Sequence, residues 1–146
     1  NFEDPVLKDN LDWYRLLREK TWIPQALHLG APAGVLAALK AEAVDYINLG
    51  GHATGVRKAA ALAEAANVPV WIQKGGLCLS VHAAYSVHLQ ATLPNATLPC
   101  DELPFTRIAD VCDGSLAVDA GHFIVPDGPG LGIHVELDVV EKYRVA

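Results

Sequence analysis

The chain has 146 residues, about the size of one ordinary domain; 51% of them are hydrophobic and 19% are charged. These proportions exclude a disordered tail or a polyelectrolyte. The net charge of −6 argues against a nucleic-acid-binding surface. No apolar run approaches the roughly 18 residues that a membrane-spanning helix needs. We therefore expect a globular, soluble protein.

The cysteine count predicts a reducing compartment. Cys78, Cys100 and Cys112 are widely spaced, odd in number and without a C-x-x-C pair. This pattern argues against a disulfide scaffold and a zinc knuckle, and we expect a cytoplasmic protein with buried thiols. Methionine is absent even at position 1, so we expect that the chain does not begin at a translation start.

Apolar periodicity predicts helices that alternate with short strands. Leu11, Tyr14 and Leu17 recur at helical spacing, and alanines from Ala59 to Ala66 form a narrow helix face that Thr54 would cap. The predicted helices cover residues 11–20, 33–42, 54–66 and 79–87, and the predicted strands cover 23–27, 44–49, 68–72 and about 97–103.

Strands and helices that alternate every 20–25 residues or so indicate βα units feeding a parallel sheet. Four or five units suit an open, doubly wound sheet, whereas a complete (β/α)₈ barrel needs about 250 residues. The last 30 or so residues differ. Residues 116–118 and 123–125 predict a hairpin, 126–132 a rigid turn, and 135–143 a terminal helix or strand.

Several segments, taken in order, resemble the barrel end of the enolase superfamily, in its mandelate racemase and muconate lactonizing branch. They are Phe2-Glu3-Asp4-Pro5, Ile23-Pro24, Val44-Asp45-Tyr46-Ile47-Asn48, Thr54-Gly55, Asp113-Gly114 and Val125-Pro126-Asp127-Gly128-Pro129-Gly130-Leu131-Gly132. The resemblance covers nearly the whole chain, and the closing Pro-x-x-Pro-Gly-Leu-Gly is its most specific piece.

The resemblance implies an α/β fold, the second half of a (β/α) TIM-like barrel whose C-terminal segment returns to a capping domain. Residues 1–113 would form the partial barrel, and 114–146 the hairpin, turn and returning segment. A half-barrel leaves sheet edges unpaired. We therefore expect another chain, or residues outside this sequence, to supply the N-terminal half of the barrel and the capping domain, in a homo-oligomer.

The same resemblance implies a divalent metal, Mg²⁺ in that family, held by acidic residues at strand ends. Glu3 matches one of these ligands. The next acidic ligand would follow Ile23-Pro24 by four or five residues, where this chain has His28 and Leu29. His28 as a ligand would favour Zn²⁺ or Fe²⁺ over Mg²⁺. A satisfied core histidine and a strand-terminal glutamate are the structural alternatives.

Proton transfer needs other groups. The acid/base position of the sixth barrel strand aligns with Gly50, so His52 in the following loop is the candidate there. The catalytic position at the end of the family's seventh strand falls on Gln73 or Lys74, and Lys74, after the apolar strand that ends at Ile72, is the candidate base or carboxylate clamp. For His52 and Lys74 alike, the alternative is a solvated loop position.

On the eighth strand, Glu102 matches the family's acidic group, and its neighbour Asp101 competes because only one of two adjacent strand residues faces the axis.

The implied reaction is proton abstraction α to the carboxylate of a small acid, by a racemase, cycloisomerase or dehydratase. A binding or structural relative that kept the scaffold and lost metal chemistry is the alternative, motivated by Leu29 and Gly50.

Overall fold

The computed structural model describes residues 1–73, 78–100, 108–113 and 116–145. Its contacts divide the chain into two compact units. Unit 1 comprises Asn1–Gln73 and Leu93–Cys100, and unit 2 comprises the described residues within Lys74–Thr92 and Asp101–Ala146. None of the described helices combines the length and apolar character that crossing a bilayer requires.

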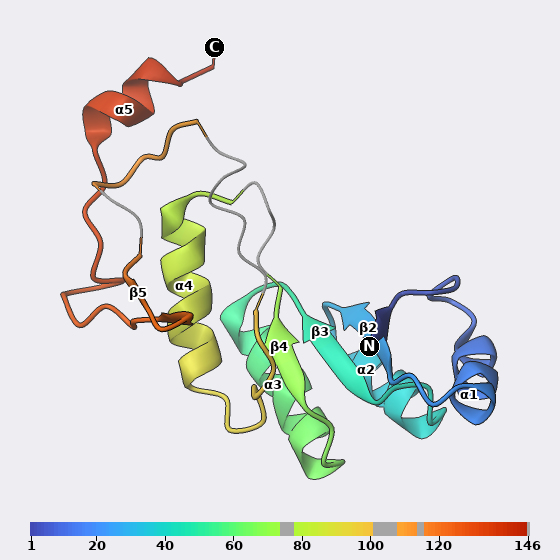
Figure 1. The fold of residues 1–146 in the computed structure, drawn as a ribbon. Coiled ribbons are helices and arrows are strands. Elements are labelled where there is room, and N and C mark those ends of the chain that lie inside the picture. Colours follow the sequence, from blue (N-terminus) through green and yellow to red (C-terminus); the bar gives the residue numbers. More distant parts are fainter. Residues whose placement is uncertain (74–77, 101–107, 114–115, 146) are drawn as a thin grey trace. The chain divides into compact units, whose positions relative to one another are not determined.

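Unit 1 is built on a parallel sheet whose strand order follows the chain, β1-β2-β3-β4 (Figure 1). The strands are β1 (Phe2–Glu3), β2 (Gln25–Leu29), β3 (Tyr46–Leu49) and β4 (Val70–Ile72). A doubly wound sheet reverses its strand order at a switch point, whereas a barrel adds each strand beside the previous one. The sequential order therefore matches part of a (β/α) barrel and excludes the doubly wound alternative for these four strands.

Three helices connect these strands: α1 (Leu11–Lys20), α2 (Pro32–Lys40) and α3 (Ala53–Ala65). Asn10 caps α1, since its side chain accepts from the backbone N–H of Trp13. The predicted cap at Thr54 is wrong. Thr54 lies inside the first turn of α3, and His52 holds the N-cap position without a side-chain hydrogen bond.

Two strand predictions also need correction. The strand expected at 23–27 begins at Gln25, because Pro24 has no N–H to donate to a sheet. Within the expected strand at 97–103, residues 97–100 do not form a strand, and 101–103 lie outside the described residues. The strands expected at 44–49 and 68–72 are confirmed in shortened form.

The two faces of the sheet differ in chemistry. The register aligns Leu27 with Ile47 and Ile47 with Val70, and these fully buried apolar side chains belong to the helix-covered face. Residues in alternate positions point to the other face, where the register aligns His28 with Asn48. His28 and Asn48 therefore share the face away from the helices.

Unit 2 contains α4 (Ser80–Ala91), a hairpin and α5 (Leu137–Lys142). The carboxylate of Asp110 caps α4 by accepting from the backbone N–H and the hydroxyl of Ser80. The hairpin consists of β5 (Val118–Asp119) and β6 (His122–Phe123), so the predicted hairpin is confirmed, with two-residue strands that lie closer to the turn than expected. The predicted terminal element is a helix.

A small apolar core holds unit 2 together. Ala83, Ala84 and Val87 of α4 pack with Leu116, and Phe123, Leu131 and Ile133 cover this cluster. The nearby Cys112 is buried, and burial, followed by the charge of Asp110, raises the pKa of its thiol. A protonated, buried thiol is a poor nucleophile.

Candidate metal and proton-transfer site

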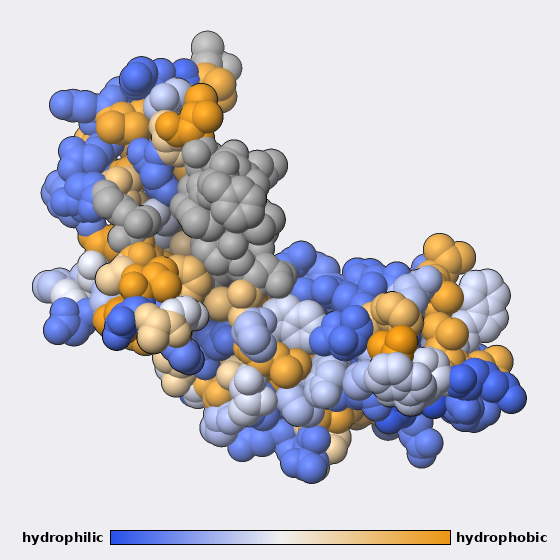
Figure 2. Space-filling view, in the orientation of Figure 1, coloured by the Kyte–Doolittle hydropathy of each residue, from blue (hydrophilic) through white to orange (hydrophobic). Residues whose placement is uncertain are grey.

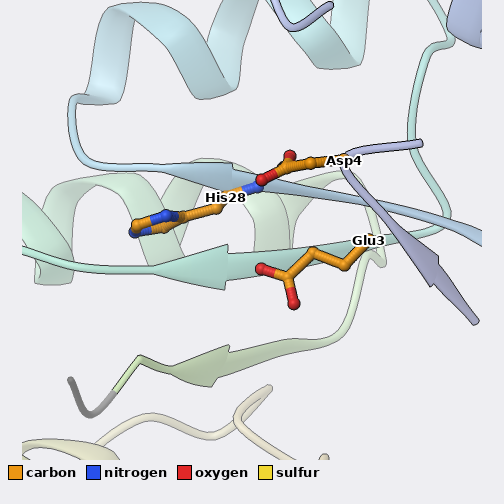
Figure 3. A group of neighbouring side chains, drawn as sticks. All are labelled: Glu3, Asp4 and His28. Atoms are coloured by element: carbon orange, nitrogen blue, oxygen red, sulfur yellow. Dashed lines mark hydrogen bonds between the residues drawn. The ribbon is translucent and has the colours of Figure 1, made fainter. Parts of the chain in front are cut away.

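Glu3, Asp4 and His28 lie together where β1 ends and β2 approaches its carboxyl end (Figure 3). One candidate ligand atom from each of these side chains lies within 4.8 Å of the others. The parallel pairing of β1 with β2 produces this arrangement, since it aligns Glu3 with Ala26 and leaves His28 two residues further along the same face. The sequence predicted Glu3 and His28 as ligands, and the structure brings them together.

Asp4 was not predicted, and its carboxylate is already engaged. One oxygen accepts from the backbone N–H of His28 at 3.1 Å, and the other pairs with Lys8 Nζ at 2.7 Å. Lys8 also donates to the carbonyl oxygen of His28 at 3.3 Å. Burial and then the negative charge of Asp4 raise the pKa of the Tyr14 hydroxyl. Asp4 therefore fixes the backbone around His28, besides adding negative charge to the site.

Glu3 is held by a residue of β3. Asn48 Nδ2 donates to Glu3 Oε1 at 2.7 Å. Asn48 is only 1% exposed, whereas Glu3 is exposed. The buried amide of Asn48 on β3 therefore contacts the exposed carboxylate of Glu3 on β1, over the strand β2 that lies between them.

The imidazole of His28 depends on the absence of a side chain at Gly50. A Cβ at Gly50 would lie 3.1 Å from His28 Nε2 and 3.4 Å from Gln73 Oε1. The first distance is tighter than an ordinary van der Waals contact, so a side chain at Gly50 would require the imidazole to shift by a few tenths of an ångström, whereas the second is an ordinary contact. His28, Gly50 and Gln73 therefore meet at the carboxyl ends of β2, β3 and β4, where parallel α/β folds place their sites.

The donor set fits a divalent cation. Ligand atoms about 2.0–2.5 Å from one ion lie within roughly 5 Å of one another, as these do. Glu3 and His28 would be the principal ligands, because both oxygens of Asp4 already have partners. A carboxylate with an imidazole suits Mn²⁺, Fe²⁺ or Zn²⁺ better than Mg²⁺.

The other predicted site residues are not members of this cluster or lie outside the described residues. His52 is exposed at the start of α3. Lys74 and Glu102, with its competitor Asp101, lie outside the described residues. Their assignments stay predictions.

Two residues of the site, Asp4 and Asn48, were missed by the sequence reasoning, whereas Gln73 was the alternative to Lys74 at the end of the seventh barrel strand. Asn48 gave a usable signal, since it is the one amide within the apolar strand Tyr46–Leu49. Polar residues in such strands usually need a partner or a role. Asp4 and Gln73 directly follow strands, which in a parallel sheet also places them at the carboxyl edge.

Comparison with known proteins gives related enzymes. The chain is 40% identical, over 101 residues, to N-succinylamino acid racemase of Thermus thermophilus; the match covers 68% of this chain and 27% of that protein. It is 30% identical over 149 residues to a D-galactonate dehydratase family member of Paenibacillus sp. (strain JDR-2), and this match covers 98% of this chain and 36% of the relative. The chain thus spans between a quarter and two-fifths of these relatives.

A solved structure agrees with this relationship. The crystal structure of 2-chloromuconate cycloisomerase from Rhodococcus opacus 1CP superposes with a TM-score of 0.89 and 28% identity, covering 99% of this chain and 41% of that one. The family model described as enolase C-terminal domain-like matches residues 1–139. The chain therefore belongs to the enolase superfamily, in its mandelate racemase and muconate lactonizing enzyme family, and corresponds to the C-terminal part of that fold.

Proposed function

We propose that this chain forms part of an enzyme that removes the proton α to the carboxylate of a small carboxylic acid, as a racemase, cycloisomerase or dehydratase. The observation that carries the proposal is the meeting of Glu3 and His28 at the carboxyl ends of adjacent parallel strands. The racemase, dehydratase and cycloisomerase relatives support the reaction class.

Charge governs this chemistry. Removing a proton next to a carboxylate creates a second negative charge, which needs a divalent cation or fixed positive groups. A cation held by Glu3 and His28 would supply that stabilisation. Lys74 would exchange the proton or neutralise the substrate carboxylate, His52 would serve as a second acid/base group, and Glu102 would orient a partner or the substrate.

A partner polypeptide is part of the proposal. β1 has two residues, both exposed, at the edge of the described sheet. The hydrophobic residues Phe2, Leu7, Trp13 and Leu16, around it and on α1, are also exposed. Figure 2 shows hydrophobic residues interspersed with hydrophilic ones on the surface of this part of the molecule. We propose that the N-terminal half of the barrel and a capping domain, from another chain or from residues outside this sequence, cover this edge. We also propose that the protein is a homo-oligomer in the cytoplasm.

A non-catalytic relative is the second candidate, and Gly50 is the observation that favours it. No side chain at Gly50 can move a proton, and His28 Nε2 fills the adjoining space. Such a protein would retain the scaffold as a binding or structural module. Cation binding and α-proton exchange distinguish the two candidates.

Replacing Glu3 by Gln tests the cation site. Glu3→Gln keeps the shape but removes the charge, so we expect the dissociation constant for Mn²⁺ to rise at least about tenfold, because even outer-shell changes have effects of that size. Isothermal titration calorimetry with Mn²⁺ measures it. Glu19→Gln is the matched control, since Glu19 is an exposed acid paired with Arg15 on α1. Equal Mn²⁺ affinity in the parent and Glu3→Gln would remove Glu3 from the site.

The reaction is tested by α-proton exchange. The Mn²⁺-loaded protein is incubated in D₂O with a panel of small carboxylic acids, and mass spectrometry detects deuterium at the α carbon. We expect exchange with at least one acid, and its loss in Glu3→Gln. Mn²⁺ binding without exchange on any acid would favour the non-catalytic candidate.

Replacing Lys74 by Ala tests the predicted base. We expect kcat/KM on an exchanging acid to fall at least tenfold, which corresponds to about 1.4 kcal/mol of lost transition-state stabilisation. Lys74→Arg should not restore the full rate if the lysine exchanges a proton, because Arg stays charged. Lys58→Ala, at an exposed position on α3, is the control. If Lys74→Ala keeps the activity of the parent, Lys74 is a solvated loop residue without a role in the reaction.

A further inference from the structure

Asn48 combines deep burial with a contact to the candidate ligand Glu3. Its side chain is 1% exposed, yet its Nδ2 lies 2.7 Å from Glu3 Oε1. The contact joins β3 to β1 across the intervening strand β2. A hydrogen bond to a charged carboxylate is shorter and stronger than one between neutral groups.

The oxygen of the same amide has no hydrogen-bond partner in the described part of the chain. Asn48 Oδ1 is buried and without a hydrogen bond among the described residues. An unpaired oxygen alone is not distinctive, because Asn95 Oδ1 is also unpaired while its Nδ2 donates to the carbonyls of Ala60 and Val68. Asn48 differs from Asn95 in its partner, which is a carboxylate at the candidate cation site rather than the backbone.

We infer that Asn48 is a positioning residue that holds one oxygen of Glu3 and leaves the other, Oε2, to bind the cation. This inference rests on the proposed cation site. With Oε1 occupied by the amide, Glu3 offers a single oxygen in a fixed direction. Asn48 Oδ1 remains available to a donor that enters with the cation, such as a bound water.

Placing a negative charge at position 48, opposite Glu3, tests whether Asn48 positions Glu3 for the cation or only packs against it. Asn48→Asp keeps the shape of the side chain but sets a second carboxylate against Glu3 Oε1. Without a cation the two negative charges repel, and a cation between or beside them relieves the repulsion. Packing alone predicts no such dependence on the cation.

The experiment measures Mn²⁺ affinity and thermal stability in the full chain, in whichever assembly it is purified. Asn48→Leu, which keeps the volume but removes the donor, should raise the Mn²⁺ dissociation constant about tenfold. Asn48→Asp should melt at a lower temperature than the parent without metal, and Mn²⁺ should raise its melting temperature by more than it raises that of the parent. Asn95→Leu should lose stability and keep the parental affinity for Mn²⁺.

Two failures are distinguishable. If the parent does not bind Mn²⁺, the cation site itself fails, and the role of Asn48 fails with it. If the parent binds Mn²⁺ and Asn48→Leu binds it as tightly, only the role of Asn48 is overturned. Equal Mn²⁺-induced shifts in Asn48→Asp and the parent would likewise make Asn48 a structural amide.

Discussion

Gly132→Ala should destabilise unit 2 by about 2–5 kcal/mol, because it combines a disfavoured backbone conformation with a steric clash. Gly132 has a φ of +66°, where an L-residue with a side chain pays roughly 1–2 kcal/mol. A Cβ there would overlap Pro126 Cβ and lie 3.1 Å from the backbone nitrogen of Gly128. Forcing an extra methyl group into such a space costs about 1–3 kcal/mol more.

The effect should spread from the turn to helix α4. Leu131 and Ile133, on either side of Gly132, cover the apolar cluster of α4, and His88 of α4 contacts the carbonyl oxygen of Leu131 at 3.2 Å. Displacing the turn therefore withdraws apolar contacts from the helix. Amide hydrogen exchange should show faster exchange in α4 as well as in the turn.

Gly130→Ala is the matched control for this prediction. Gly130 has nearly the same φ, +68°, but a Cβ there would meet nothing within 4 Å. Gly130→Ala should therefore lower the free energy of unfolding only by the cost of the disfavoured backbone conformation, roughly 1–2 kcal/mol. Urea unfolding of both variants measures the difference, and equal losses would show that the contact with Pro126 and Gly128 has no energetic weight.

Periodicity was sufficient to predict helices α1 to α3 and strands β2 to β4 of unit 1, because each of them has a clear apolar pattern. It did not predict β1, whose two residues are both exposed. It failed on details decided by single groups. Pro24 delays the start of β2, and the backbone of the Gly50–Ala53 loop places His52, rather than Thr54, at the start of α3. Residues 97–100 show the limit of propensity, since short apolar segments form strands only where a partner strand pairs with them.

The sequence predicted those residues of the candidate site that lie at the ends of predicted strands. Glu3 and His28 follow from the resemblance and from strand ends, and the register brings them together. The roles of Asp4 and Asn48 required the structure, because each acts on a residue 24 or 45 positions away in the chain. The steric dependence of His28 on Gly50 is likewise a property of neighbouring strands, which no local pattern contains.

Alternate residues along and just after strand β3 belong either to the apolar core or to the proposed cation site. Ile47 and Leu49 are fully buried on the helix-covered face, whereas Asn48 and Gly50 face His28, Glu3 and Gln73. Side chains at successive strand positions point to opposite faces, so a change on one face should leave the other largely undisturbed. Leu29, which pairs with Leu49, lies 3.6 Å from where a Cβ on Gly34 of α2 would be, consistent with the helix side.

Leu49→Ala should therefore cost about 2–5 kcal/mol of stability, the range for removing a large buried side chain, and leave the Mn²⁺ dissociation constant at its parental value. Ile47→Val, which should cost about 0.5–1.5 kcal/mol, gives a milder change on the same face in case Leu49→Ala does not fold. Urea unfolding and Mn²⁺ titration of these variants beside Asn48→Leu make the comparison. Weakened Mn²⁺ binding in Ile47→Val would show that the two faces are coupled, since packing on the helix side would then set the position of Asn48 and, through it, of Glu3.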